Sequence, residues 1–397
     1  MTYDEAINSV HKTEWKKAIE KEIGSLKENK TWVLTDLPKG AKVIPSKWVF
    51  KLKRNPDGSI DKYKARLVIK GYSQRKGIDY NQTFSPVARL GTIRAVLSVA
   101  ASENLYLSQF DVSTAFLYGE LEEEVYMFQP EGYDDGSGRV CLLIRSLYGL
   151  KQAPRCWNIR FGGYLLKLGF HVSEADPCLY IRIVNGNIII IALYVDDGLA
   201  GATKNEDLQS FLKDLQEEFK ITLKENADYF LGLEIERVCG GIKIKQESYA
   251  KKLLLRFNFS ECKSVSTPML SNQEFCTEGK EEEKNSTFPY RQAVGALMYL
   301  MLGTRPDLAY SVGVLSRSLE SPSAEDINRL KRVFRYISGS TDLGITYSSD
   351  KQQKILKIYS DADFGGCTKT GRSTSGMISI YAGGPITWCS QRQSIVA

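Results

Sequence analysis

Apolar residues near the start of the chain recur at helical spacing. Trp15, Ile19, Ile23 and Leu26 follow one another at intervals of three or four residues, which places them on one face of a helix that packs against a core. Residues 1–28 are therefore predicted to form an N-terminal helix. Further helices are predicted at residues 92–102, 206–219, 290–302 and 326–337.

Two hairpins are predicted between these helices. In the first, half-apolar segments at residues 47–53 and 63–70 flank a turn at Asn55-Pro56-Asp57-Gly58. In the second, residues 179–184 and 188–194 flank Asn185-Gly186. Residues 188–191 are apolar on both faces, which predicts a central, buried strand.

The remaining pattern predicts a mixed α/β fold with more than one domain. One strand is expected to end at Asp111-Val112, and another is expected at residues 355–360. The polar segment 271–287 carries three consecutive glutamates and is predicted to be a linker. A second boundary is expected near residues 340–355. A length of 397 residues agrees with two or three domains.

Composition excludes several classes of protein. The longest apolar run has eight residues, whereas a membrane-spanning helix needs about 20, and the charged N-terminus lacks the apolar core of a secretory signal. The eight cysteines form no C-x-x-C pair, so neither a zinc site nor a disulfide framework is indicated and a reducing compartment is favoured. With only two histidines, histidine-based catalysis is disfavoured.

The net charge of +6 is unevenly distributed. Residues 39–76 hold twelve Lys or Arg against two Asp, a net charge of +10. Aromatic residues such as Trp48, Phe50, Tyr63 and Tyr72 are interleaved with these cations, which suits a surface that meets phosphates. A solvated strand face is the alternative explanation.

Acidic residues follow the buried strand. Asp196 and Asp197 come directly after Tyr194-Val195, and Asp197-Gly198 alone would be typical of an ordinary hairpin turn. Asp111 ends another strand, and an antiparallel neighbour of residues 188–194 would bring three carboxylates together. Divalent metal relieves their repulsion, and oxygen-only ligands favour Mg²⁺. Two ions roughly 4 Å apart can activate a primer 3′-hydroxyl and stabilise a leaving pyrophosphate, which is nucleotidyl transfer.

Three motifs carry a family resemblance. The series FDVSTAFLYGEL, LYGLKQAPRCW and YVDD, in this order and spacing, resembles the reverse transcriptase of copia-type LTR retrotransposons. The resemblance begins at TEWKKAIEKEIGSLKENKTW and continues through KWVFKLKRNPDGSIDKYKARLVIKGYSQRKGIDY, YFLGLEI and YRQAVGALMYLMLGTRPD to YSDADFGG. It therefore covers nearly the whole chain.

The resemblance implies a right-hand polymerase fold. Fingers, palm and thumb are expected at residues 29–271, a connection region at 288–340 and an incomplete RNase H-like domain at 355–397. The implied cofactor is Mg²⁺, with two ions and Mn²⁺ as a substitute. The implied partners are an RNA template, a DNA primer, RNA/DNA hybrid and dNTPs, in an intracellular, cytoplasmic particle with access to the nucleus.

Catalytic residues are implied by the same resemblance. Asp111, Asp196 and Asp197 would be the metal-binding catalytic triad, and the backbone oxygen of Val112 would be an added metal ligand. Asp361 would be the first ligand of an RNase H-like site. Because residues 364–397 contain no Asp or Glu, this chain is expected to lack RNase H activity.

Nucleotide- and primer-binding residues are implied as well. Lys64 and Arg66 would grip the triphosphate, with Arg suited to it by a bidentate fork. Phe116 stands at the steric gate against a ribose 2′-hydroxyl, and Tyr148 stands where retroviral relatives place a Gln. The primer grip would comprise Phe230, Leu231 and Gly232.

Simpler explanations exist for these residues. Phe116 could be a packing residue, Lys64 and Arg66 could be solvated, and residues 230–232 could belong to an ordinary amphipathic hairpin. At the level of the whole chain, the alternatives are another palm-type polymerase and a decayed or domesticated retrotransposon relic that binds nucleic acid without catalysis.

Overall fold

The N-terminal part of the chain is a helix laid across a β-hairpin. The computed structural model describes residues 1–54, 59–270, 288–367 and 370–396. After the short helix α1 (Tyr3–Ile7), helix α2 (Lys12–Glu28) packs on strands β3 (Ser46–Arg54) and β4 (Ile60–Ile69). The four apolar residues predicted on one face of α2 are all at most 5% exposed. The Trp15 ring lies edge-on to Phe50 and Tyr63, at 5.2 and 4.7 Å between ring centroids.

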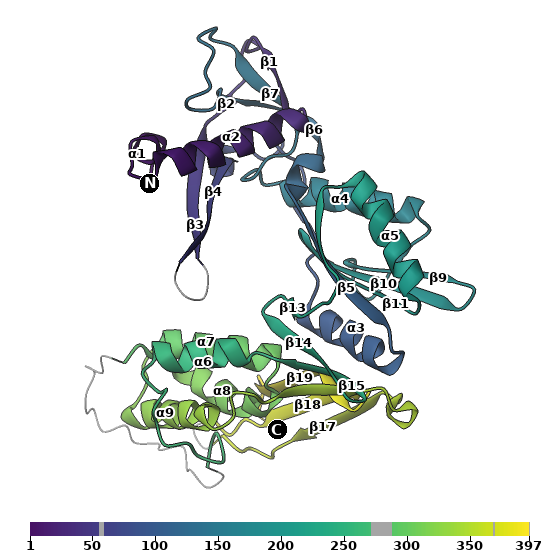
Figure 1. Ribbon diagram of the computed structural model, residues 1–397. Coiled ribbons are helices and arrows are strands. Elements are labelled where there is room, and N and C mark those ends of the chain that lie inside the picture. The colour runs from purple at the N-terminus through teal and green to yellow at the C-terminus, as the bar shows by residue number, and fades with distance from the viewer. Residues whose placement is uncertain (55–58, 271–287, 368–369, 397) are drawn as a thin grey trace.

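The predicted hairpin is confirmed in β3 and β4, which pair antiparallel over their whole length. Its turn residues, 55–58, lie outside the described residues. A second, four-stranded sheet in the order β1-β7-β6-β2 lies beside the hairpin (Figure 1). It consists of β1 (Trp32–Thr35), β2 (Val43–Ile44), β6 (Glu120–Met127) and β7 (Val140–Arg145).

A six-stranded antiparallel sheet forms the middle of the molecule, in the order β12-β5-β11-β10-β9-β8. Its strands are β5 (Tyr106–Val112), β8 (His171–Val172), β9 (Leu179–Val184), β10 (Asn187–Tyr194), β11 (Asp197–Ala202) and β12 (Ile221–Lys224). One face is covered by α4 (Ala153–Lys167) and α5 (Asn205–Glu218), and the other face is covered by α3 (Leu90–Ser102).

Strand β10 is central and buried, as its apolar sequence predicted. Ile189, Ile191 and Leu193 contact the core beneath α4 and α5, whereas Ile190 and Ala192 contact the core beneath α3. This is the alternation that a strand covered on both faces requires. The sheet is thereby held between two hydrophobic layers, and the ends of its strands are fixed.

A helical region follows the middle sheet. Helices α6 (Glu247–Arg256), α7 (Tyr290–Gly303), α8 (Ala309–Leu315) and α9 (Ala324–Ser338) share one core. A small sheet in the order β13-β14-β15-β16 connects them to the middle sheet. It contains β13 (Tyr229–Phe230), β14 (Leu233–Val238), β15 (Gly241–Lys245) and β16 (Gly344–Ser348). The predicted linker at residues 271–287 lies outside the described residues.

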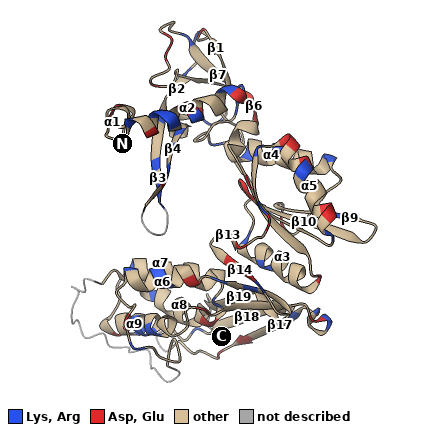
Figure 2. Cartoon of the chain, viewed as in Figure 1, with Lys and Arg blue, Asp and Glu red and all other residues tan. Residues whose placement is uncertain are grey.

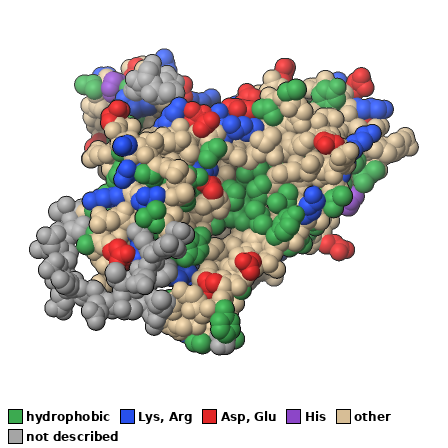
Figure 3. All heavy atoms as spheres, turned by 90° about the horizontal axis from the view of Figure 1, so that it is seen from below, with side chains coloured by type: hydrophobic (Ala, Val, Ile, Leu, Met, Phe, Trp, Pro, Cys, Tyr) green, Lys and Arg blue, Asp and Glu red, His purple; other side chains and the backbone are tan. Residues whose placement is uncertain are grey.

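The last three strands form a separate antiparallel sheet. Strands β17 (Lys357–Ala362), β18 (Thr374–Tyr381) and β19 (Gly384–Arg392) pair in chain order. Strand β19 packs on α3 and α8, whereas all six residues of β17 are exposed. Figure 3, seen from the side on which this sheet lies in Figure 1, shows hydrophobic side chains gathered on that face.

Arg94 joins α3 to the C-terminal sheet and to α7. Its guanidinium donates to the carbonyl oxygens of Ile386, Leu302 and Gly303 at 2.6–3.0 Å and lies 4.1 Å from the centre of the Trp388 ring. Burial lowers the pKa of Arg94 to about 10.

The mixed α/β fold that the sequence predicted is confirmed. Among the described helices, none has both the length and the apolar character needed to cross a bilayer.

Candidate active site

Three aspartates lie at one end of the six-stranded sheet. Asp111 is the next-to-last residue of β5, and Asp197 is the first residue of β11 directly opposite it in the antiparallel register. Asp196 precedes Asp197 in the turn, and its carbonyl oxygen accepts the N–H of Val112 at 2.8 Å. The three residues are therefore brought together as predicted. The neighbour of β5 is the returning strand β11, however, and not the strand at residues 188–194.

A two-residue turn joins β10 to β11 and contains the first of the two adjacent aspartates. Tyr194 pairs with Asp197, so Val195 and Asp196 form the turn, and Val195 has a φ of +58°. The Trp157 indole N–H donates to the Val195 carbonyl oxygen at 2.6 Å and supports this strained residue. The turn lies two residues earlier than Asp197-Gly198 had suggested.

Gly198 is required by packing. It lies in β11 opposite Phe110, and a Cβ atom at this position would stand 2.0 Å from the Phe110 ring. Any side chain would therefore push the ring away and disturb the strand that carries Asp111. Gly198 in the Asp-Gly pair allows β11 to lie close to β5. The preference of Asp-Gly for turns does not predict this contact.

Burial and mutual repulsion act on these carboxylates. Burial, followed by the neighbouring charges of Asp196 and Asp111, raises the pKa of Asp197 to about 6. The pKa of Asp196 is also raised, chiefly by burial and further by Asp111, although Arg66 and Lys64 oppose this shift. In the described part of the chain, none of the three carboxylates forms an ion pair.

The chemistry of these donors fits a divalent cation. Three carboxylates supply only oxygen ligands, and repulsion among them is relieved by positive charge. Over the described residues, no group of three or more His, Cys, Asp or Glu is already gathered in a metal-binding arrangement.

Arg66, Tyr148 and Phe116 form a stack beside the carboxylates. The guanidinium carbon of Arg66 lies 4.3 Å from the centre of the Tyr148 ring, and an Arg66 N–H donates to the Tyr148 hydroxyl at 3.3 Å. The Tyr148 ring lies 4.7 Å from the Phe116 ring, which belongs to the 3₁₀ turn Ala115–Tyr118. Burial raises the pKa of Tyr148 to about 12, so its hydroxyl stays protonated at neutral pH.

The cations of the hairpin share one face. The register pairs Lys51 with Lys64, Lys53 with Lys62 and Val49 with Arg66, so these side chains project away from α2. Figure 2 shows Lys and Arg along this hairpin. Burial, together with repulsion from Arg66 and Lys53, lowers the pKa of Lys64, whereas Asp111 raises it. Lys64 and Arg66 form the inner end of this cationic face, the end that approaches the carboxylates.

The predicted primer-grip residues form the turn between β13 and β14. Phe230 is fully buried and pairs with Leu233, so its side chain belongs to the core. Leu231, with a φ of +50°, and Gly232 make the turn itself. The Tyr299 hydroxyl of α7 donates to the Leu231 carbonyl oxygen at 3.3 Å, which ties the turn to the helical region.

Asp361, the predicted first ligand of an RNase H-like site, lies in β17 of the C-terminal sheet. Its carboxylate accepts the N–H of Ala362 at 2.8 Å. The nearby Asp363 carboxylate accepts the backbone N–H groups of Gly366 and Thr374 at 2.9 Å. Two local hydrogen bonds therefore occupy this second carboxylate, which follows directly after β17.

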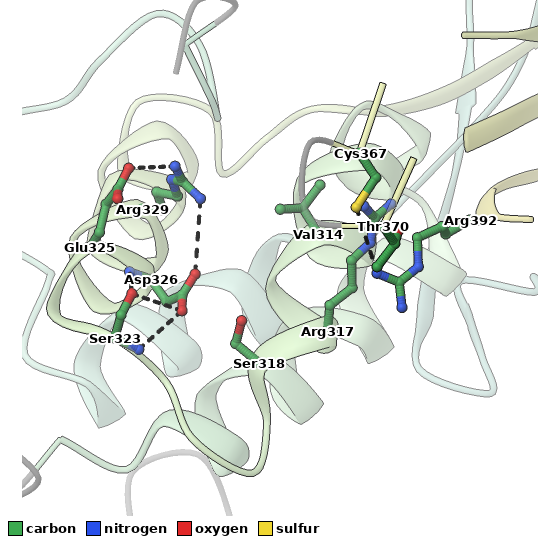
Figure 4. A pocket seen from close by; sticks show the side chains of 10 residues that line it. All are labelled: Val314, Arg317, Ser318, Ser323, Glu325, Asp326, Arg329, Cys367, Thr370 and Arg392. Atoms are coloured by element: carbon green, nitrogen blue, oxygen red, sulfur yellow. Dashed lines mark hydrogen bonds and ion pairs between the residues drawn. The ribbon is translucent and has the colours of Figure 1, made fainter. Parts of the chain in front are cut away.

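A pocket lies between α9 and the C-terminal sheet (Figure 4). Arg317 and Arg392 line one side, and Ser323, Asp326 and Arg329 line the other. Asp326 accepts from Ser323 in a capping box and lies 3.9 Å from Arg329. None of the three carboxylates at the end of the middle sheet lines this pocket.

Sequence reasoning missed two supporting residues of the site. Trp157 lies within the LYGLKQAPRCW motif, and a buried Trp normally needs a partner for its indole N–H, which was the available signal. Lys224 lowers the pKa of Asp197 by its charge. It comes from β12, a short strand that the sequence pattern did not predict.

The comparisons with known proteins identify the family. Residues 29–271 match the family described as reverse transcriptase (RNA-dependent DNA polymerase). The chain belongs to this family, and its predicted copia-type retrotransposon character is confirmed by the relatives that it resembles.

The most similar relatives include retrotransposon polyproteins. The chain is 42% identical to the retrovirus-related Pol polyprotein from transposon TNT 1-94 of Nicotiana tabacum, over 99% of this chain and 30% of that protein. It is 40% identical to the corresponding polyprotein from transposon RE2 of Arabidopsis thaliana, over 98% and 27%. A putative transposon Ty5-1 protein of Saccharomyces cerevisiae is 32% identical, over 71% of this chain and 92% of that protein. The chain thus spans about 30% or less of the length of the plant polyproteins.

Among solved structures, the chain is similar to a foamy viral protease-reverse transcriptase in complex with double-stranded DNA. The similarity has a TM-score of 0.49 at 14% sequence identity, and it covers 96% of this chain and 56% of that chain.

Proposed function

We propose that this chain is an RNA-directed DNA polymerase that transfers nucleotides from dNTPs to a primer 3′-hydroxyl on an RNA or DNA template. The observation that carries the proposal is the group of three carboxylates without ion-pair partners in the described chain, facing the inner end of a basic hairpin. Family membership agrees with this chemistry. Residues 29–271 would be the polymerase domain, residues 288–340 the connection region and residues 355–397 an RNase H-like region.

The carboxylates are assigned to the metal-binding role. Asp111, Asp196 and Asp197 would hold two Mg²⁺ ions, with the carbonyl oxygen of Val112 as an added ligand. When bound, such ions lower the pKa of the primer hydroxyl and neutralise charge on the pyrophosphate. The raised pKa of Asp197 supports this role, because a cation is the group that would stabilise its ionised form.

Three side chains are assigned to the incoming dNTP. Lys64 and Arg66 would bind the triphosphate by charge and by the planar guanidinium fork. Phe116 would exclude a ribose 2′-hydroxyl, and its contact with Tyr148 supports a fixed ring position. Tyr148 would stack beneath the nascent base pair, and the turn at Leu231-Gly232 would hold the primer.

Primer extension on an RNA template with Mg²⁺ tests the proposal. The wild-type protein is expected to lengthen a labelled DNA primer when all four dNTPs are present, and a chelator is expected to stop extension. Binding of template-primer is measured in parallel. Tight binding with no extension over a range of Mg²⁺ and Mn²⁺ would instead identify a relic that binds nucleic acid without catalysis.

A further inference from the structure

Glu22 is a carboxylate on the buried face of helix α2. It is 8% exposed and lies among the apolar residues that pack on the hairpin. Its Oε1 accepts the backbone N–H of Leu67 at 3.2 Å. A buried carboxylate is costly unless hydrogen bonds and nearby positive charge compensate it, and here the cost raises the pKa of Glu22. The match to the reverse transcriptase family begins at residue 29, directly after the N-terminal helix, whereas the plant relatives match nearly the whole chain.

The hydrogen bond fixes the outer edge of β4. Strand β3 pairs with one edge of β4, and Leu67 and Ile69 donate their N–H groups on the other edge. Leu67 donates to Glu22, and Ile69 donates to the carbonyl oxygen of Tyr148 at 2.9 Å. Without these acceptors, the edge would have unpaired backbone donors. Arg66 immediately precedes this pair of anchored residues.

The segment that carries Tyr148 is held firmly against β4. A Cβ atom on Gly149 would stand 2.1 Å from the Ile69 carbonyl oxygen, so only glycine permits this approach. Next to it, the N–H of Lys151 donates to Gln74 Oε1, and Gln74 in turn donates to Gln152 Oε1, both at 2.9 Å. Tyr148 is therefore a fixed partner for the Arg66 side chain.

Charge adds to this geometry. Arg66 and Lys64 both act to lower the pKa of Glu22, and Glu22 acts to raise the pKa of Lys64. The carboxylate thus favours the charged form of a lysine that two neighbouring cations disfavour. The charge of Glu22 also helps to raise the pKa of Tyr148, but the hydrogen bond of its side chain is made to β4, at Leu67.

We propose that Glu22 is a positioning residue for nucleotide binding: by holding the β4 edge at Leu67, it sets the direction in which Arg66 and Lys64 meet a triphosphate. This inference rests on the proposed polymerase function and deepens it. The N-terminal helix then becomes part of the nucleotide site, although it lies outside the polymerase family match.

Steady-state primer extension with three variants of the full chain tests the proposal. Glu22→Ala removes the acceptor, Glu22→Gln keeps an acceptor oxygen without charge, and Glu22→Asp keeps the charge one methylene further away. We expect Glu22→Ala and Glu22→Asp to raise the KM for dNTP about tenfold, since a lost hydrogen bond of about 1.4 kcal/mol corresponds to that factor. Glu22→Gln should stay within about threefold of wild type.

Controls separate positioning from a loss of folding. Glu20→Ala changes an exposed residue of the same helix and should leave the KM unchanged, whereas Arg66→Ala sets the scale for loss of the cation itself. A burst-phase titration measures the folded, active fraction of each preparation, and thermal unfolding is recorded alongside. Positioning predicts a raised KM with kcat within about threefold of wild type and an unchanged Kd for template-primer.

Each outcome has one meaning. If the active fraction falls while the KM of the remaining enzyme equals that of wild type, Glu22 only stabilises the fold and the inference is wrong. If Glu22→Ala does not fold, Glu22→Asp gives the same decision. If the wild-type protein does not extend primers, the proposed function fails first and the inference fails with it.

Discussion

The two carboxylate-bearing strands of this chain differ in their surroundings more than in their sequences. Tyr194-Val195-Asp196-Asp197 and Tyr359-Ser360-Asp361 each place acidic residues near the end of a strand. The first lies in a sheet that is covered by helices on both faces. The second lies on β17, where every residue is exposed. Environment, rather than the local motif, determines what these side chains can do.

Burial creates the difference in electrostatic energy. In the middle sheet, burial and neighbouring carboxylates raise the pKa of Asp197 to about 6, so its ionised form is costly without a cation. In the C-terminal sheet, backbone N–H groups of Gly366 and Thr374 help to lower the pKa of Asp363. At the end of the middle sheet, the charges of Lys224, Arg66 and Lys64 offset the raised carboxylate pKa values only in part. In the C-terminal sheet, hydrogen bonds from the backbone stabilise the Asp363 carboxylate.

The largest effect is expected from the loss of a carboxylate in the middle sheet. Asp197→Asn should reduce primer extension by about a thousandfold or more, because it removes a metal ligand that acts on the transition state. The Kd for template-primer should change little, since we expect the phosphate contacts to come from the hairpin cations. Single-turnover extension measures the loss. Residual activity within tenfold of wild type would remove Asp197 from the catalytic site.

A smaller effect is expected at the aromatic ring beside the carboxylates. Phe116→Val would open space next to Tyr148, so the preference for dNTP over rNTP should fall by about 10- to 100-fold through loss of a steric clash. Single-nucleotide extension with matched dNTP and rNTP measures the ratio. Tyr118→Phe, in the same 3₁₀ turn, is the control and should keep the wild-type ratio. An unchanged ratio in Phe116→Val would leave Phe116 as a packing residue.

The sequence predicted that Asp111, Asp196 and Asp197 lie together and that residues 188–194 form a central strand, because both depend on local patterns. The uninterrupted apolar run at residues 188–191 predicts a buried strand, and the series of motifs located Asp111, Asp196 and Asp197. The register was beyond such reasoning, since β5 pairs with β11 through contacts such as Phe110 against Gly198. Strands β6, β7, β15 and β16 were also missed.

Long-range partners explain the rest of what the sequence could not reveal. Glu22 looks like one more charged residue of an amphipathic helix, and only the fold places it at Leu67. Arg94 likewise meets the carbonyl oxygens of Leu302 and Ile386, about 200 and 300 residues further along the chain. Neither pairing has a signature in local spacing or composition.

The same Asp197→Asn substitution should stabilise the metal-free protein. The folded pKa of about 6 exceeds the ordinary value of 3.8, so between pH 4 and 6 the folded state retains a proton that the unfolded state has lost. The free energy of unfolding of the wild type therefore decreases as pH rises through this window. Asn removes this penalty, and for a half-buried group the gain above pH 6 should be about 1–2 kcal/mol.

Urea unfolding in EDTA from pH 4 to 8 measures this gain. The difference between Asp197→Asn and wild type should grow up to pH 6 and then level off, whereas Asp361→Asn should follow the wild-type curve throughout. Adding Mg²⁺ at pH 7.5 should narrow the difference, because the ion stabilises only the protein that keeps its carboxylate. A difference that does not vary with pH would show that Asp197 imposes no electrostatic cost.

The smallest effect is expected from Asp361 itself. Hydrolysis of an RNA strand with two Mg²⁺ ions requires several converging carboxylates. Asp361 and Asp363 are the only acidic residues between positions 357 and 397. Backbone N–H groups already donate hydrogen bonds to Asp363. We therefore expect the chain as given to cleave no RNA/DNA hybrid, and Asp361→Asn to leave primer extension within about twofold of wild type. A labelled hybrid incubated with Mg²⁺ is the assay, and the double variant Asp196→Asn, Asp197→Asn removes any contribution from the other site. Cleavage that survives in that double variant but disappears on adding Asp361→Asn would show that an exposed strand can assemble a metal site after all.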